Sequence, residues 1–181
     1  MNLMASKAEV QRAAMADVRS GKPRQDVFET YRAQVNPEKH LAFSIASVAD
    51  GDRMKQGEKL NNLLFGMLIF AAVSKALIAM PYFQVSFFRG LFMLALGLLI
   101  PVAFAMAVRK YDGQVYPFII MLAGLGALVA LLKIREAGSW MLLEAVLLGV
   151  IAALAFRVQR VVFPNINGFS VRKGAQGNYV W

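Results

Sequence analysis

Four long apolar runs follow one another along the middle of the chain, and only short polar segments separate them. Each run has 18 to 21 residues, and the four are Leu60–Met80, Leu91–Val108, Val115–Leu132 and Ser139–Phe156. An α-helix needs about 20 residues to cross about 30 Å of hydrocarbon. The pattern therefore predicts an all-α, polytopic membrane protein in which these runs form a bundle of four transmembrane helices.

The first 59 residues are polar, and the spacing of their apolar positions predicts three short amphipathic helices. Ser6 followed by Glu9 has the spacing of a capping box, which indicates the start of the first helix. Pro23 suits the first turn of a second helix, and Asn36-Pro37 suits the N-cap and first turn of a third. We expect residues 1–59 to form a helical cap that packs on itself, lies at the membrane surface or binds a partner.

The last segment, residues 157–181, differs from both the cap and the spans. Turn-forming residues fill positions 163–169, whereas Asn178-Tyr179-Val180-Trp181 is unusually apolar for the end of a chain. Frayed ends are normally polar. We therefore expect this tail to dock, either on the chain's own cap or on a partner, and the sequence leaves both open.

Charge predicts the orientation of the spans. The formal net charge is +9, from 20 Lys and Arg against 11 Asp and Glu. With both ends of the chain inside, sixteen Lys and Arg fall on the inner side and four on the outer side. Lys and Arg gather on the cytoplasmic side of membrane proteins, so we expect both termini in the cytoplasm. No basic run is interleaved with exposed aromatic residues, so we expect no nucleic-acid partner.

The sequence also bears on localisation. No short apolar segment with a small-residue cleavage site precedes the first run, so we expect no removable signal peptide and a first span that acts as its own insertion signal. The chain has no Asn-x-Ser/Thr sequon, which is compatible with a bacterial inner membrane. We therefore expect a multi-pass protein of the plasma membrane.

Two of the residues within the four runs carry a full charge, Lys75 and Glu144. Each lies five residues from the outer end of its run, which places both about 7–8 Å below the outer surface. We therefore predict that they face each other, with Arg89 as a supporting charge. Three interpretations are open: the pair fixes only the packing of the helices, Lys75 extends to the outer surface, or Glu144 belongs to an ion or proton pathway.

Small residues and one proline predict how the spans pack. Ala145, Gly149 and Ala153 are four residues apart in the fourth run and form a predicted helix-packing stripe, within one chain or between copies. Pro101 lies in the second run, four residues after Gly97, and predicts a kink there.

Catalytic motifs are missing from the sequence. The chain has no cysteine and one histidine, His40, so the usual metal ligands are scarce. Neither a HExxH motif, a GxSxG motif nor a phosphate-binding GxxxxGK[ST] loop occurs. We therefore expect no cofactor, no metal and no enzymatic activity.

Two functional hypotheses remain. The first is a non-catalytic membrane protein that acts by protein–protein interaction within the membrane, as an accessory subunit or a protective, immunity-type factor. The second is a homo-oligomeric ion channel or small transporter that uses Glu144 and Lys75. Expected partners are membrane lipids, together with either a protein partner or further copies of the chain.

Overall fold

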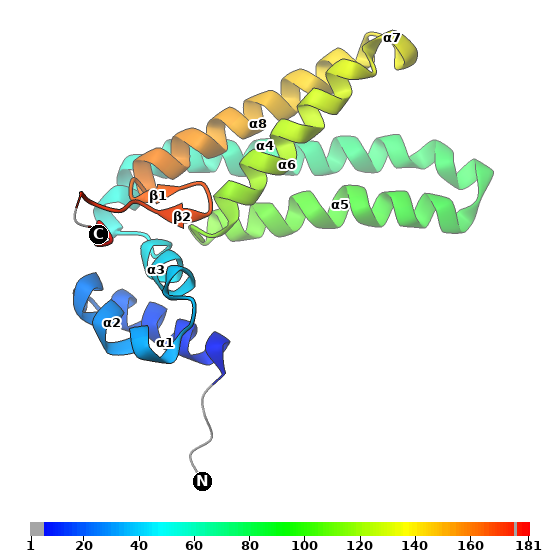
Figure 1. The fold of residues 1–181 in the computed structure, drawn as a ribbon. Helices are drawn as coiled ribbons and strands as arrows, with labels where there is room; N and C mark the ends of the chain where they lie inside the picture. Colours follow the sequence, from blue (N-terminus) through cyan, green and yellow to red (C-terminus); the bar gives the residue numbers. More distant parts are fainter. Residues whose placement is uncertain (1–5, 176) are drawn as a thin grey trace.

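The computed structural model describes residues 6–175 and 177–181; residues 1–5 of the predicted cap lie outside the described residues. The fold is all-α apart from one short hairpin, as predicted, and Figure 1 shows its arrangement. The elements are α1 (Lys7–Arg19), α2 (Arg24–Tyr31), the 3-10 helix η1 (Arg32–Gln34), α3 (Glu38–Ala46), α4 (Gly51–Val85), α5 (Phe87–Arg109), α6 (Val115–Leu132), α7 (Ile134–Ala137), α8 (Trp140–Val162), β1 (Ile166–Asn167) and β2 (Ser170–Val171).

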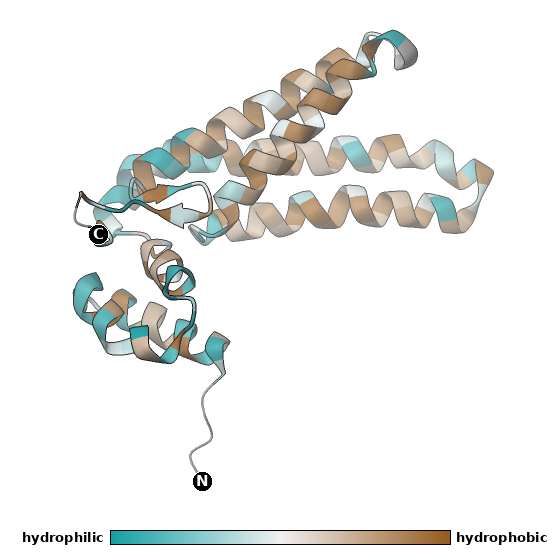
Figure 2. Cartoon of the chain, in the orientation of Figure 1, coloured by the Kyte–Doolittle hydropathy of each residue, from teal (hydrophilic) through white to brown (hydrophobic). Residues whose placement is uncertain are grey.

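Four of these helices, α4, α5, α6 and α8, are long and apolar enough to cross a membrane. They contain the four predicted spans, and α6 has the predicted bounds of Val115–Leu132. In Figure 2 hydrophobic residues run along all four, whereas hydrophilic residues gather on α1–α3 and around α7. The chain is therefore a small integral membrane protein with four apolar helices.

The first span corrects the prediction, because α4 is 35 residues long and runs far beyond residues 60–80. It begins after Asp50, whose side chain accepts from the backbone N–H of Asp52 at 3.2 Å. The predicted span stops at Met80, but Pro81 lies inside the helix, which continues for one more turn. A proline removes a single backbone hydrogen bond, and the chain turns only at Ser86, where the backbone is extended.

The long helices form two hairpins that meet at one end. The first hairpin is α4 with α5, the second is α6 with α8, and the two are joined where α4 packs on α8. Figure 1 shows the hairpins side by side near the β1–β2 hairpin and diverging toward α7 and the α4–α5 turn. The four spans therefore do not close into one bundle along their whole length.

A close contact between helices occurs at Gly97, and not at Gly149 of the predicted packing stripe. A Cβ built on Gly97 would lie 3.0 Å from the Cβ of Lys75, which brings α5 close to α4. Ala145 is buried, but Gly149 has nothing within 4 Å of its Cβ position and Ala153 is exposed. Only Ala145 of the predicted stripe is thus buried, and a packing role for the whole stripe, within one chain or between copies, stays a prediction.

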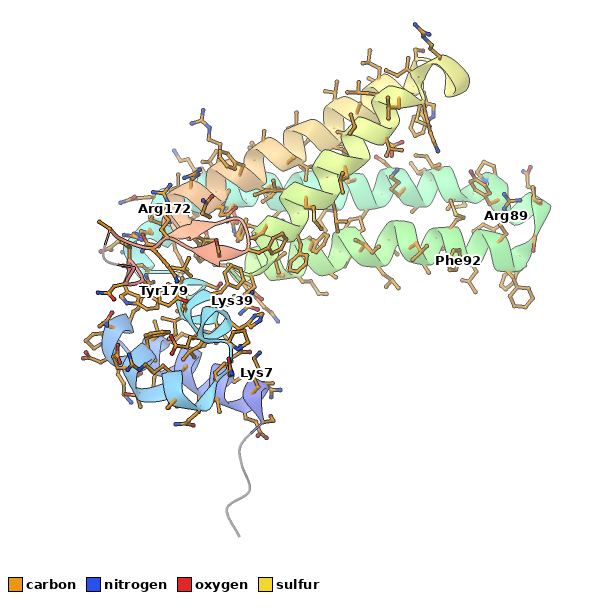
Figure 3. All side chains as sticks on the ribbon, in the orientation of Figure 1. Lys7, Lys39, Arg89, Phe92, Arg172 and Tyr179 are labelled. Carbon is orange, nitrogen blue, oxygen red and sulfur yellow. The ribbon has the colours of Figure 1, made fainter. Side chains whose placement is uncertain are left out.

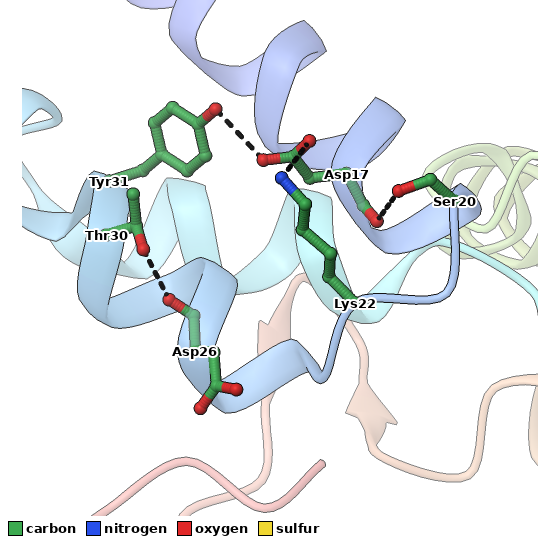
Figure 4. A network of polar contacts seen from close by, with 6 residues as sticks. All are labelled: Asp17, Ser20, Lys22, Asp26, Thr30 and Tyr31. Atoms are coloured by element: carbon green, nitrogen blue, oxygen red, sulfur yellow. Dashed lines mark hydrogen bonds and ion pairs between the residues drawn. The ribbon is translucent and has the colours of Figure 1, made fainter.

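The head, residues 6–50, is a packed group of helices beside the membrane region. Ser6 and Glu9 form the predicted capping box at the start of α1. Asp17 joins the end of α1 to α2, because its carboxylate pairs with Lys22 at 2.9 Å and accepts from the Tyr31 hydroxyl at 3.1 Å (Figure 4). Two details differ from the prediction: α2 begins at Arg24 and α3 at Glu38, so Pro23 and Pro37 both occupy N-cap positions.

The tail, residues 163–181, docks on the head. Tyr179 and Trp181 both pack on Phe28 of α2, with ring centroids 5.2 and 5.5 Å apart. Figure 3 places Tyr179 between the hairpin strands and the head. Of the two possibilities left by the sequence, docking on the chain's own head is the one observed, and residues 157–162 of the predicted tail belong to α8.

Candidate functional site

The most distinctive polar feature among the spans is the ion pair of Lys75 and Glu144. Lys75 lies on α4 and Glu144 on α8, and the lysine Nζ contacts a carboxylate oxygen of the glutamate. The contact predicted from their equal depth is therefore present. The pair joins the two hairpins, and its side chains are 37% and 15% exposed.

The pair lies in the wall of an open cleft between the hairpins. The cleft has a volume of about 880 Å³ and is lined by all four long helices. Its residues are Lys75, Ile78, Pro81, Tyr82, Met93, Leu125, Gly126, Val129, Ala130, Lys133, Trp140, Met141 and Glu144. The lining is mostly apolar, with Gly126 and Ala130 as small residues and the ion pair as a charged group. We call this space the lateral cleft.

A second opening reaches the same ion pair. This groove has a volume of about 440 Å³ and is lined by α4 and α8 alone. Lys75, Trp140 and Glu144 line both spaces, whereas Phe70, Ser74 and Leu147 belong only to the groove. The pair is therefore accessible from two directions at one depth in the protein.

The chemistry of this arrangement is that of a compensated charge. A carboxylate or an ammonium alone in an apolar region is strongly unfavourable, and pairing removes most of that penalty. The other two spans, residues 91–108 and 115–132, contain no charged residue. Lys133, the C-cap of α6, is a further charged residue of the cleft lining. The ion pair itself lies on an apolar surface, where it can hold helix register or bind one polar group of an incoming partner.

Arg89, the predicted supporting charge, is not brought to the pair. It is exposed at the far end of the α4–α5 hairpin, as Figure 3 shows, and its guanidinium lies over the Tyr82 ring at 5.6 Å. The reason is that the α4 helix continues to Val85, which carries Arg89 beyond the cleft.

Gly97 and Pro101, the residues of the predicted kink, lie in different surroundings on α5. Gly97 packs against the Cβ of Lys75 and so supports the α4 side of the cleft. Pro101 lines a small apolar cavity of about 130 Å³ together with Leu68, Phe104 and Ile119. The helix α5 continues through Pro101 to Arg109, and the kink stays a prediction.

A buried polar network was missed by the sequence reasoning. Asn61 on α4 donates to the backbone carbonyl of Val108 at 2.9 Å and accepts from the Tyr116 hydroxyl at 2.6 Å. Both side chains are almost fully buried, at 1% and 0% exposed. The sequence held one hint, a polar Asn61 at the start of an apolar run, but its two partners lie 47 and 55 residues away.

The described residues hold no group of three or more His, Cys, Asp or Glu side chains that could bind a metal ion. Comparisons of the chain with known protein families, with curated proteins and with solved structures find no match. Function is therefore argued from the geometry of the cleft alone.

Proposed function

We propose that this chain is a non-catalytic membrane protein that binds one transmembrane helix of another protein in the lateral cleft. The role would be that of an accessory subunit or a protective, immunity-type factor. The observation that supports it is the separation of the two hairpins, which leaves a space of about 880 Å³ open between four apolar helices.

Three properties of the cleft suit a helix. Between 11% and 28% of each apolar stretch is buried inside the protein, so most of the span surface remains for lipid or a partner. Leu125 and Val129 line the cleft from α6 with exposed apolar side chains, on which a partner helix can pack. The Lys75–Glu144 pair adds a polar point that favours one partner register over others.

We propose a plasma-membrane location, in a bacterial inner membrane, with both ends of the chain in the cytoplasm. The docking of Tyr179 and Trp181 on Phe28 supports a location of both ends on the same side of the membrane. These residues can touch only if an even number of helices crosses the membrane between them. The excess of Lys and Arg on the side that holds both ends supports a cytoplasmic location for that side.

The second candidate is a homo-oligomeric channel or small transporter that uses Glu144 and Lys75. The observation in its favour is the access to the ion pair from both the lateral cleft and the α4–α8 groove. Against it stands the absence of any charged residue in the spans of α5 and α6, because a conducting path needs polar groups at several depths.

The proposal is tested by filling the cleft. Val129 lines it and is 49% exposed, whereas its neighbour Leu128 does not line it and is 53% exposed. We expect Val129→Trp to abolish a stoichiometric hetero-complex, seen by native mass determination after gentle solubilisation, and Leu128→Trp to leave it intact.

Because the chain has no cysteine, single-cysteine variants complete the test. A thiol cross-linker on Val129→Cys, but not on Leu128→Cys, should join the chain to the same foreign protein found in the complex. A cross-link to a second copy of this chain would favour the channel, and flux through vesicles altered by Glu144→Gln would then support it. A strict monomer in which neither cysteine is cross-linked to a protein overturns the interaction proposal.

A further inference from the structure

A second cavity lies in the head, far from the lateral cleft, and it is lined by basic residues. It has a volume of about 570 Å³ and opens between the end of α1, the start of α2 and the start of α4. Four basic side chains line it, Arg19, Lys22, Arg24 and Arg53, together with Asp50 and Trp181. The end of α1, the start of α2 and the start of α4 therefore bring positive charge to one place.

Arg24 is fixed in this cavity by the fold. Its guanidinium donates to the backbone carbonyl of Val48 at 2.7 Å, which orients the group at the wall of the cavity. Burial lowers the pKa of Arg24, and the nearby positive charge of Arg53 lowers it further. Arg24 and Arg53 thus bring two guanidinium groups to one cavity.

The carboxylates of the head offset only part of this charge: Asp50 lines the cavity, and its negative charge acts to raise the pKa of Arg24. Lys22 pairs with Asp17, and Asp50 accepts from the N–H of Asp52 as the N-cap of α4. Among the residues that the structure describes, no carboxylate lies within 4.0 Å of the charged nitrogens of Arg19, Arg24 or Arg53. The cavity therefore keeps a surplus of positive charge.

We propose that this cavity binds a phosphate group. Guanidinium groups bind phosphate oxygens through paired N–H donors, and an anion here would offset the repulsion between Arg24 and Arg53. Two sources share this chemistry, the headgroup of an anionic lipid and a soluble phosphate compound.

The position of the cavity bears on both sources. Arg53 lies seven residues before Leu60, the first residue of the apolar run, which is about 10 Å along α4. That distance places the cavity just outside the hydrocarbon, near the layer where lipid phosphates lie and where basic side chains attract them. The cavity is also open to water on the same side, so a soluble anion can reach it.

The chain offers its own reporter for the test. It has two tryptophans, and Trp181 lines the cavity, whereas Trp140 lines the lateral cleft. A Trp140→Phe background leaves Trp181 as the single source of tryptophan fluorescence. The full chain in phosphatidylcholine nanodiscs is titrated with inorganic pyrophosphate, and the same chain is compared in nanodiscs with and without phosphatidylglycerol.

We expect a saturable change in Trp181 fluorescence in at least one of the two arms. Saturation by pyrophosphate in phosphatidylcholine identifies a soluble phosphate as a ligand, and a response to phosphatidylglycerol alone identifies a lipid headgroup. Arg53→Gln should weaken the binding on the order of tenfold, because one paired contact to the anion is lost. Arg53→Lys, which keeps the charge but not the paired donors, should recover part of it.

The matched control is Arg12→Gln, which removes the same charge from an exposed position of α1 outside the cavity. It should bind as the parent does, and circular dichroism should show that all variants keep their helix content. The proposal is overturned if neither arm saturates, or if Arg12→Gln weakens binding as much as Arg53→Gln does. The second result would mean attraction to net charge rather than to a site.

Discussion

At the scale of single residues, the spans contain polar groups whose contribution to stability depends on their partners. Lys75 and Glu144 satisfy each other between α4 and α8, and Asn61 uses both ends of its amide, toward Val108 and Tyr116. A polar group in an apolar region is tolerated when it is paired and is costly when it is left alone. Removing one partner of a pair should therefore destabilise the protein more than removing both.

The ion pair tests this rule. We expect Glu144→Leu to destabilise the protein by about 1–3 kcal/mol, below the 3–5 kcal/mol of fully buried pairs because Lys75 is 37% exposed. The double variant Lys75→Met/Glu144→Leu should recover most of that loss. The measurement is reversible unfolding in mixed detergent micelles, followed by circular dichroism. A double variant as unstable as the sum of the two single variants would show that the charges act independently.

At the scale of elements, the hairpins depend on how closely their helices approach. Gly97 faces Lys75, whereas Gly149 on α8 has open space at its Cβ position. The two glycines look equivalent in the sequence, since each lies within an apolar run. Only the rotation of each helix about its axis separates them, and that rotation is set by the whole packing arrangement.

These two glycines give a matched pair of substitutions. Gly97→Leu should force α5 away from α4 and destabilise the protein by about 1–3 kcal/mol, as overpacking does. Gly149→Leu should change stability by less than about 0.5 kcal/mol, because the added side chain meets lipid. Thermal or denaturant unfolding in micelles distinguishes the two. Equal losses would mean that Gly149 faces a partner that is lost with it.

The corner between α1 and α2 predicts a response to acid. The hydrogen bond from Lys22, with a second from Tyr31, holds the pKa of Asp17 below its ordinary value of 3.8. A lowered folded-state pKa stabilises the fold above the unfolded-state pKa, and this stability is lost as the pH falls through the folded-state value. The head should therefore loosen in acid below about pH 4.

Asp17→Asn should weaken this acid dependence and leave the head less stable at neutral pH. Helix content is followed by circular dichroism between pH 7 and pH 3. Asp26→Asn is the control, because Asp26 uses its backbone carbonyl, and not its carboxylate, to bind Thr30 (Figure 4). If Asp26→Asn changes the acid response as Asp17→Asn does, the effect comes from net charge.

At the scale of the whole molecule, the spans could be predicted from the sequence because their length and apolar content are local properties. The contact of Lys75 with Glu144 could be predicted because depth follows from residue count. The packing of α4 on α8, the divergence of the hairpins and the cavity around Arg24 could not, because they join segments far apart in the chain. The predicted end of the first span at Met80 was too early, because a membrane helix tolerates a proline such as Pro81 that a soluble helix does not.

The orientation of the molecule is tested with single cysteines at exposed positions. Ala13→Cys in the head and Ser170→Cys in the tail should react with a membrane-impermeant maleimide only in inside-out vesicles. Ser139→Cys, between α7 and α8, should react only in right-side-out vesicles. Reaction of Ala13→Cys and Ser170→Cys from opposite sides would contradict the even number of crossings.

The length of α4 links the two ends of the protein mechanically. Arg53 and Lys75 lie on one continuous helix, 22 residues or about 33 Å apart, so α4 connects the cavity beside the head with the ion pair between the spans. A rotation of α4 about its axis turns both side chains by the same angle. If an anion bound at Arg53 rotates α4, the affinity of the lateral cleft for its occupant changes. By linkage, an occupant of the cleft then changes the anion affinity by the same factor.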